Sequence, residues 1–112
     1  MPVRLIATAF LAIAYLASSA VFAAEAVSVD IKLFQFKPKE LEVKKGTTVT
    51  WTNGDAIEHS VTAGKPGKAP SDFDSGFFTK GGSFEHSFAE PGTFTYFCKR
   101  HTNMTATVMV TE

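Results

Sequence analysis

The sequence contains a single cysteine, and this scarcity excludes several kinds of small exported domain. One cysteine cannot form a disulfide within the chain, and it cannot supply the paired cysteines that structural zinc sites often use. The C-x-x-C-H motif that attaches a c-type haem is also missing. Cys98 must therefore be a free thiol, one half of a bridge to another molecule, or a metal ligand.

An excess of charge of either sign is absent as well. The 11 Lys and Arg residues balance 11 Asp and Glu residues, and this balance argues against nucleic acid as a partner. The helical period of apolar residues is also missing, and no internal repeat divides the chain. What recurs instead is the alternation of β-branched and aromatic residues, punctuated by Gly and Pro.

The first 23 residues have the pattern of a cleavable secretory signal peptide. Arg4 supplies a positive charge near the start, residues 5–16 form an uncharged apolar run, and small residues follow. The run is shorter than the roughly 20 residues that a membrane-spanning helix needs, although a retained membrane anchor is the other interpretation. We predict cleavage after Ala23, with cleavage after Ala26 as the alternative. Residues 24–112 would then form one exported, periplasmic, monomeric domain without a membrane segment.

Seven or eight short strands are predicted in residues 24–112. Alternating segments are separated by turn signals such as KKG, NGD, KGG and EPG. Short strands at this spacing are typical of an all-β fold, a Greek-key antiparallel β-sandwich. The Gly- and Pro-rich residues 64–75 are predicted to form a polar surface loop. The alternating segments are residues 27–36, 40–46, 47–53, 59–63, 83–88, 93–98 and 105–112.

Cys98, His101 and Met104 follow one another at intervals of three residues. On a continuous strand, positions 98 and 101 would face opposite sides, so the three side chains can converge only if the chain turns after Cys98. The intervening KRHTN has no strand pattern, which predicts a loop between two strands with the three side chains turned inward. A fourth ligand would come from elsewhere. His59, at the start of a short strand, is favoured over His86, which lies inside an apparent strand.

A thiolate, two imidazoles and a thioether favour copper over other metals. Zinc does not seek thioether ligands, whereas two His and one Cys with a weak Met ligand are the blue-copper set. Imidazoles support Cu(II) and sulfur ligands support Cu(I). A site between these two preferences can change oxidation state with little movement of its ligands.

The order of these motifs resembles that of the cupredoxins, the small blue copper proteins. The resemblance covers nearly all of residues 24–112, and the short C-x2-H-x2-M loop is similar to that of amicyanins. The chain departs from the family pattern at Ser60, Arg100, Thr102 and Ala106. The matching positions are Phe36, Pro38, Leu41, Val43, Gly46, Val49, Trp51, Asn53, Asp55, His59, Val61, Phe88, Pro91, Gly92, Thr93, Tyr96, Cys98, His101 and Met104.

The resemblance implies a one-electron carrier that holds one copper ion and is not an enzyme in its own right. His59, Cys98 and His101 would be the equatorial ligands and Met104 the axial one. The backbone N–H of Ser60 would donate to the Cys98 sulfur. The resemblance also implies redox proteins as partners, and an amicyanin-like loop suggests a dehydrogenase as donor and a c-type cytochrome as acceptor.

The same residues also fit other interpretations. A copper chaperone or copper store would use the same ligands. A Cys–His hydrolase would need an orienting third group, and none stands out. A metal-free sandwich with a buried cysteine would leave the spacing unexplained. Lys99 and Arg100, beside His101, are either an ordinary solvated pair or a basic surface that attracts an acidic partner.

Overall fold

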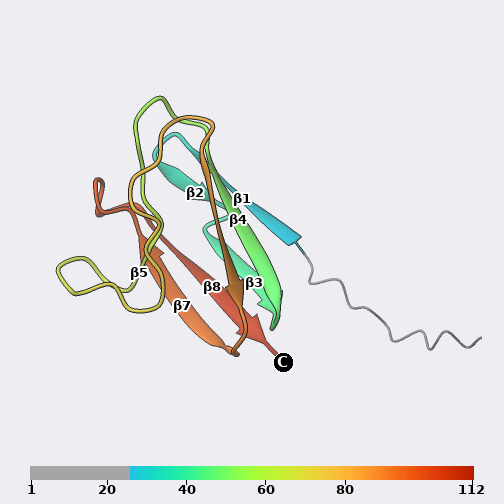
Figure 1. Ribbon diagram of the computed structural model, residues 1–112. Helices are drawn as coiled ribbons and strands as arrows, with labels where there is room; N and C mark the ends of the chain where they lie inside the picture. The colour runs from blue at the N-terminus through green and yellow to red at the C-terminus, as the bar shows by residue number, and fades with distance from the viewer. Residues whose placement is uncertain (1–25) are drawn as a thin grey trace, which may run out of the picture.

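The structure is a computed structural model that describes residues 26–112, and the predicted signal peptide lies outside the described residues. Eight strands account for about half of this part of the chain (Figure 1). No helix in residues 26–112 is long and apolar enough to cross a membrane. The strands are β1 (Ala26–Lys32), β2 (Gln35–Lys37), β3 (Glu40–Lys44), β4 (Thr47–Asn53), β5 (Thr62–Ala63), β6 (Ser83–Phe88), β7 (Gly92–Phe97) and β8 (Thr105–Thr111).

Two four-stranded sheets form the sandwich, which confirms the predicted all-β fold class. One sheet has the strand order β2-β1-β4-β6 and the other has the order β3-β8-β7-β5. The pairing is mixed and not purely antiparallel as expected, because β1 pairs with β4 and β3 pairs with β8 in parallel. The reason is that the chain leaves the first sheet after β2, forms β3 in the second sheet, and returns to the first sheet with β4.

The KKG turn after β3 is a corner between the two sheets and not a hairpin. Gly46 has φ of 87°, a left-handed conformation that glycine adopts without a Cβ clash. Its N–H donates to the carbonyl of Phe88 at 2.7 Å, and the N–H of Lys45 donates to the carbonyl of Thr111 at 2.8 Å. These bonds tie the corner to the ends of β6 and β8, one in each sheet.

A turn breaks the first predicted strand, residues 27–36, into β1 and β2. Leu33 and Phe34 have φ of 52° and 59°, a region that residues other than glycine rarely occupy. Leu33 is 66% exposed, so the inward alternation predicted through this residue is wrong. The chain reverses here, and β2 pairs antiparallel with β1. The turn thereby brings Phe34 to the end of the sandwich where the predicted ligands lie.

Trp51 is the centre of the core and is fully buried between the sheets. The rings of Tyr96 and Phe73 lie 5.5 and 5.9 Å from the Trp51 ring, centroid to centroid. Phe73 corrects part of the prediction for residues 64–75. Residues 65–72 are exposed as expected, but Phe73 is only 7% exposed, because its ring fills the space beside Trp51.

Candidate metal centre

The loop between β7 and β8 turns the predicted ligands toward the protein interior. The N–H of Cys98 donates to the carbonyl of Met104 at 3.0 Å, and the N–H of Met104 donates to the carbonyl of His101 at 2.8 Å. These two bonds close the loop. Cys98 and Met104 are buried and His101 is partly exposed, as the turn predicted from the sequence requires. Figure 1 shows this loop at the end of β8 away from the C-terminus.

His59 reaches the same place from the connection between β4 and β5. Its backbone forms an isolated bridge with Phe78, in which each N–H donates to the carbonyl of the other residue, at 3.2 and 2.9 Å. The side chain is fully buried, and its Nδ1 lies 3.7 Å from Sγ of Cys98. The fold thus brings together two candidate ligands that are 39 residues apart in the chain.

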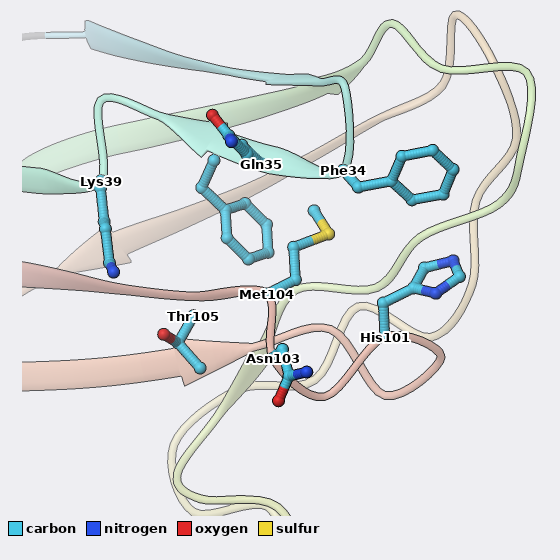
Figure 2. Close-up of a pocket in the computed structure, with 8 residues that line it drawn as sticks. Phe34, Gln35, Lys39, His101, Asn103, Met104 and Thr105 are labelled. Atoms are coloured by element: carbon cyan, nitrogen blue, oxygen red, sulfur yellow. The ribbon is translucent and has the colours of Figure 1, made fainter.

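Phe34 packs edge-on against both candidate histidines. Its ring centroid lies 5.5 Å from that of His59 and 4.9 Å from that of His101, and the two histidine rings are 5.4 Å apart. Phe34, His101 and Met104 also line a surface pocket of about 540 Å³ beside β2. Figure 2 shows the side chains of His101 and Met104 leaving the same loop on the side that faces Phe34. Phe34 was not identified from the sequence, since its role depends on the unexpected turn.

Asp55 links the Phe34 turn to His59. One carboxylate oxygen accepts the N–H of Leu33 at 2.8 Å, and the other accepts the N–H of Phe34 at 2.9 Å and lies 2.9 Å from Nε2 of His59. Burial alone would raise the pKa of Asp55. The hydrogen bonds from Phe34, His59 and Leu33 outweigh burial and hold this pKa below its usual value. A carboxylate behind a ligating imidazole orients the ring and makes it a stronger donor.

The connection that carries Asp55 and His59 is itself shaped by Asn53, which is fully buried. The side-chain oxygen of Asn53 accepts the N–H of Asp55 at 2.8 Å, and its amide group donates to the carbonyls of Ile57 and Phe78 at 2.9 and 3.0 Å. Asn53 and Asp55 both belong to the family motif. Sequence reasoning assigned no role to either residue because the partners of Asp55 at Leu33 and Phe34 lie in a distant part of the chain.

Ser60 contacts Cys98 as the family resemblance implies. Its N–H donates to the Cys98 sulfur at 3.4 Å. Its hydroxyl group accepts the N–H of Lys99 at 2.8 Å, so Ser60 holds the Cys98–Lys99 segment at two points. The short serine side chain therefore reaches the ligand loop.

The donor set is chemically suited to a soft or borderline metal. Nε2 of His101 is buried and has no hydrogen-bond partner within residues 26–112. A bound metal would provide such a ring nitrogen with a partner. No three His, Cys, Asp or Glu side chains in these residues form a metal cage by themselves. The Met104 thioether is the additional donor on the same loop, and thioether selects soft ions such as Cu(I).

His86 lies apart from this donor set, on β6. Its ring packs against Phe73 and Phe88, with centroid distances of 4.6 and 4.8 Å. Partial burial lowers the pKa of His86, and the nearby Asp72 carboxylate partly opposes the shift. This setting is that of a histidine at the edge of the core.

We expect His86 to make the protein less stable in mild acid. The pKa of His86 is lower in the folded chain than its usual value of about 6.5, so in mild acid the unfolded chain binds a proton more readily than the folded chain. The free energy of unfolding is therefore highest above that value and decreases as the pH falls. The free energy of unfolding in urea should therefore fall between about pH 7.5 and about pH 5.5. In His86→Gln the fall should be smaller. An identical fall in both proteins would show that His86 is not responsible.

Lys99 and Arg100 do not form an uncompensated basic surface. Nζ of Lys99 lies 2.8 Å from the Asp74 carboxylate, and a guanidinium nitrogen of Arg100 lies 3.0 Å from the Glu58 carboxylate. Each cation is thus neutralised by an acid from a neighbouring loop. The structure therefore does not support the basic patch that the sequence suggested beside His101.

Comparison with known proteins identifies similar chains. A family model described as copper binding proteins of the plastocyanin/azurin family matches residues 23–111. Amicyanin-alpha of Methylorubrum extorquens is 33% identical over 107 residues, which are 91% of this chain and 90% of that protein. Amicyanin of Paracoccus versutus is 33% identical over 87 residues, which are 78% of this chain. The match spans slightly less than two thirds of that amicyanin, at 66% of its length.

Solved structures of a cupredoxin and an amicyanin are also similar to this chain. A purple cupredoxin from Nitrosopumilus maritimus superposes with a TM-score of 0.70 at 32% identity, covering 76% of this chain and 99% of that one. A mutant amicyanin in the Cu(I) state superposes with a TM-score of 0.69 at 31% identity, covering 77% of this chain and 82% of that one. The family-model match over residues 23–111 includes the sandwich and the loops that carry the candidate ligands.

Proposed function

The chain belongs to the plastocyanin/azurin family of copper-binding proteins, the cupredoxins, and we propose that it is a periplasmic electron carrier whose one copper ion alternates between Cu(II) and Cu(I). The observation that carries this proposal is the approach of His59 Nδ1 to within 3.7 Å of Cys98 Sγ, with the His101 ring 5.4 Å from the His59 ring and Met104 in the same loop as Cys98. Bound copper would supply one-electron redox chemistry. The oxidised and reduced states in which amicyanins have been solved support the proposed cycling.

The proposed ligands are His59, Cys98, His101 and Met104. Three features of the protein would keep them in place when the charge of the site changes. The loop bonds close Cys98 against Met104, and Asp55 orients the His59 ring. The Ser60 N–H donates to the sulfur and would stabilise its thiolate charge.

Electrons would enter and leave through His101, the partly exposed candidate ligand. Four exposed apolar side chains fall into two groups. Leu33 and Phe34 belong to the Phe34 turn, and Ile57 and Phe77 come from loops that contact the ligand loop. Phe34 packs on His101, Phe77 lies under the Lys99 ammonium, and Ile57 precedes Glu58, the partner of Arg100. This surface fits a redox protein with an apolar contact area. The exposed side chains are Leu33, Phe34, Ile57 and Phe77.

The amicyanin resemblance supports a dehydrogenase as electron donor and a c-type cytochrome as acceptor. It also supports a carrier over an enzyme in its own right. Export directed by the predicted signal peptide would place the protein in the periplasm.

Titration of the protein lacking residues 1–23 with Cu(II) tests the proposal. We expect an intense visible charge-transfer band that saturates at about one copper per chain, as the His₂CysMet ligand set requires. Ascorbate should bleach the band, and an oxidant should restore it. Tight copper binding without this band would contradict the electron-carrier proposal and favour copper delivery or storage.

A further inference from the structure

A ring of hydrogen bonds connects the ligand loop to two other loops through Ser60. The Ser60 hydroxyl lies 3.0 Å from the Thr62 hydroxyl, which donates to one oxygen of Asp74 at 3.0 Å. The other oxygen of Asp74 accepts Nζ of Lys99 at 2.8 Å. The backbone N–H of Lys99 donates back to the Ser60 hydroxyl at 2.8 Å, which closes the ring.

Burial fixes the orientation of the hydroxyl groups in the inner half of this ring, which consists of Ser60 and Thr62. Ser60 and Thr62 are both fully buried. A buried hydroxyl without a partner costs about 1–3 kcal/mol, so each hydroxyl is held to the orientation that satisfies its neighbours. The side chains of Lys99 and Asp74 are 36% and 28% exposed, so this ion pair closes the ring at the protein surface.

Asp74 receives more than one donor, which fixes its position. In addition to Thr62 and Lys99, it accepts the N–H of Gly76 at 3.0 Å. Burial works to raise the pKa of Asp74, but the bonds from Lys99, Gly76 and Thr62 hold this pKa below its usual value. The carboxylate therefore remains a charged acceptor for both Thr62 and Lys99.

We propose that Thr62, Asp74 and Lys99 are positioning residues for the Cys98 thiolate, acting through Ser60. The inference rests on the proposed copper function. Ser60 touches Cys98 by its N–H and the next peptide by its hydroxyl, so whatever fixes Ser60 also fixes the 3.4 Å N–H···Sγ contact. Hydrogen bonds to a ligating sulfur tune the reduction potential, because they withdraw charge from the thiolate.

The test is Thr62→Val, with Thr62→Ser as the matched variant that keeps the hydroxyl group. Valine removes both hydrogen bonds of the ring at this position with little change in shape. We expect the copper-loaded Val variant to have a lower reduction potential than the wild type, because a longer contact leaves more charge on the sulfur. We expect the copper-free Val variant to exchange the Lys99 amide hydrogen faster. Thr62→Ser should restore both values toward the wild type.

Two results would overturn the inference. The first is that the Val and Ser variants share one potential and one exchange rate. The second is that exchange quickens but the potential stays unchanged, which would leave the ring a purely structural device. The exchange experiment needs no copper. A wild-type protein without the blue band would therefore contradict the proposed function, while the exchange rates would still decide whether the ring holds the loop.

A surface variant keeps the inference testable if Thr62→Val does not fold. Lys99→Met breaks the outer ion pair of the ring. Arg100→Met is the matched control: it also removes one positive charge from this loop, but it breaks only the pair with Glu58, which is not part of the ring. The Lys99 variant should show the larger shift of potential and the larger increase in exchange. Equal changes in the two variants would overturn the inference.

Discussion

Replacing Cys98 with serine is expected to abolish the visible charge-transfer band of the copper-loaded protein. The band requires a thiolate bound to Cu(II), and a serine hydroxyl is a poor donor for copper. The sandwich should remain folded, because the exchange is nearly isosteric. Its cost is the burial of a hydroxyl group at a fully buried position, about 1–3 kcal/mol. Absorption and circular dichroism spectra of the same sample check both expectations.

The control for this experiment is Met109→Leu. Met109 also carries sulfur, but it is 38% exposed and lies within β8, outside the ligand loop. This variant should keep the full band and its copper stoichiometry. A Cys98→Ser protein with the band of the wild type would contradict the assignment of Cys98 as a ligand.

Replacing Asp55 with alanine is expected to have the largest effect outside the proposed ligand set. The exchange leaves the N–H groups of Leu33 and Phe34 without their acceptor in a left-handed turn, and it frees Nε2 of His59. Loss of these contacts should lower the free energy of unfolding by about 3 kcal/mol or more. Copper affinity should fall about 10–100-fold, because the carboxylate orients the imidazole ligand.

Asp30→Ala is a suitable control, since Asp30 is an exposed aspartate on β1 of the same hairpin. Its removal should change stability by less than about 0.5 kcal/mol. Asp55→Asn should fall between the two variants, because its amide oxygen can accept only part of the hydrogen bonds. Urea unfolding and competition for copper with a chelator measure the two effects. An Asp55→Ala loss no greater than that of Asp30→Ala would remove the basis for this role.

Copper should also stabilise the folded chain. The proposed ligands come together only in the folded state, where His59 meets Cys98 across 39 residues of sequence. A metal that binds the folded state alone raises its stability in proportion to the logarithm of the free metal concentration over Kd. The free energy of unfolding of Asp55→Ala should therefore be measured with and without copper, so that the loss of fold stability is separated from the loss of copper affinity.

Most strand positions could be predicted from the sequence because they depend on local alternation. Side chains on a strand point to opposite faces in turn, and this period is visible around Val49 and Trp51 as well as in Phe84 to Phe88. The pattern failed at Leu33, where apolar alternation continues through a turn. Hydrogen bonds from Leu33 and Phe34 to Asp55, 22 and 21 residues away, stabilise this turn, and no local signal reveals them.

The candidate ligands could also be chosen from the sequence, because their chemistry is carried by residue type and spacing. Cys98, His101 and Met104 lie within one short loop, and His59 was favoured over His86 by its place at a strand start. The structure puts His86 against Phe73 and Phe88 and brings His59 to Cys98. The ligand assignment itself remains a prediction until copper is bound and measured.

The β-rich class, the loop after β7 and the donor types available for copper could be read from the sequence, since each depends on residues close together in the chain. The fold was needed to show which sheet each strand joins, how Phe34 meets His101, and how Ser60 is connected to Lys99. These features arise from contacts between distant segments, such as the contact between Ser60 and Lys99, which are 39 positions apart in the chain. Such contacts are selected by packing and by the need to satisfy buried polar groups, which a local pattern does not record.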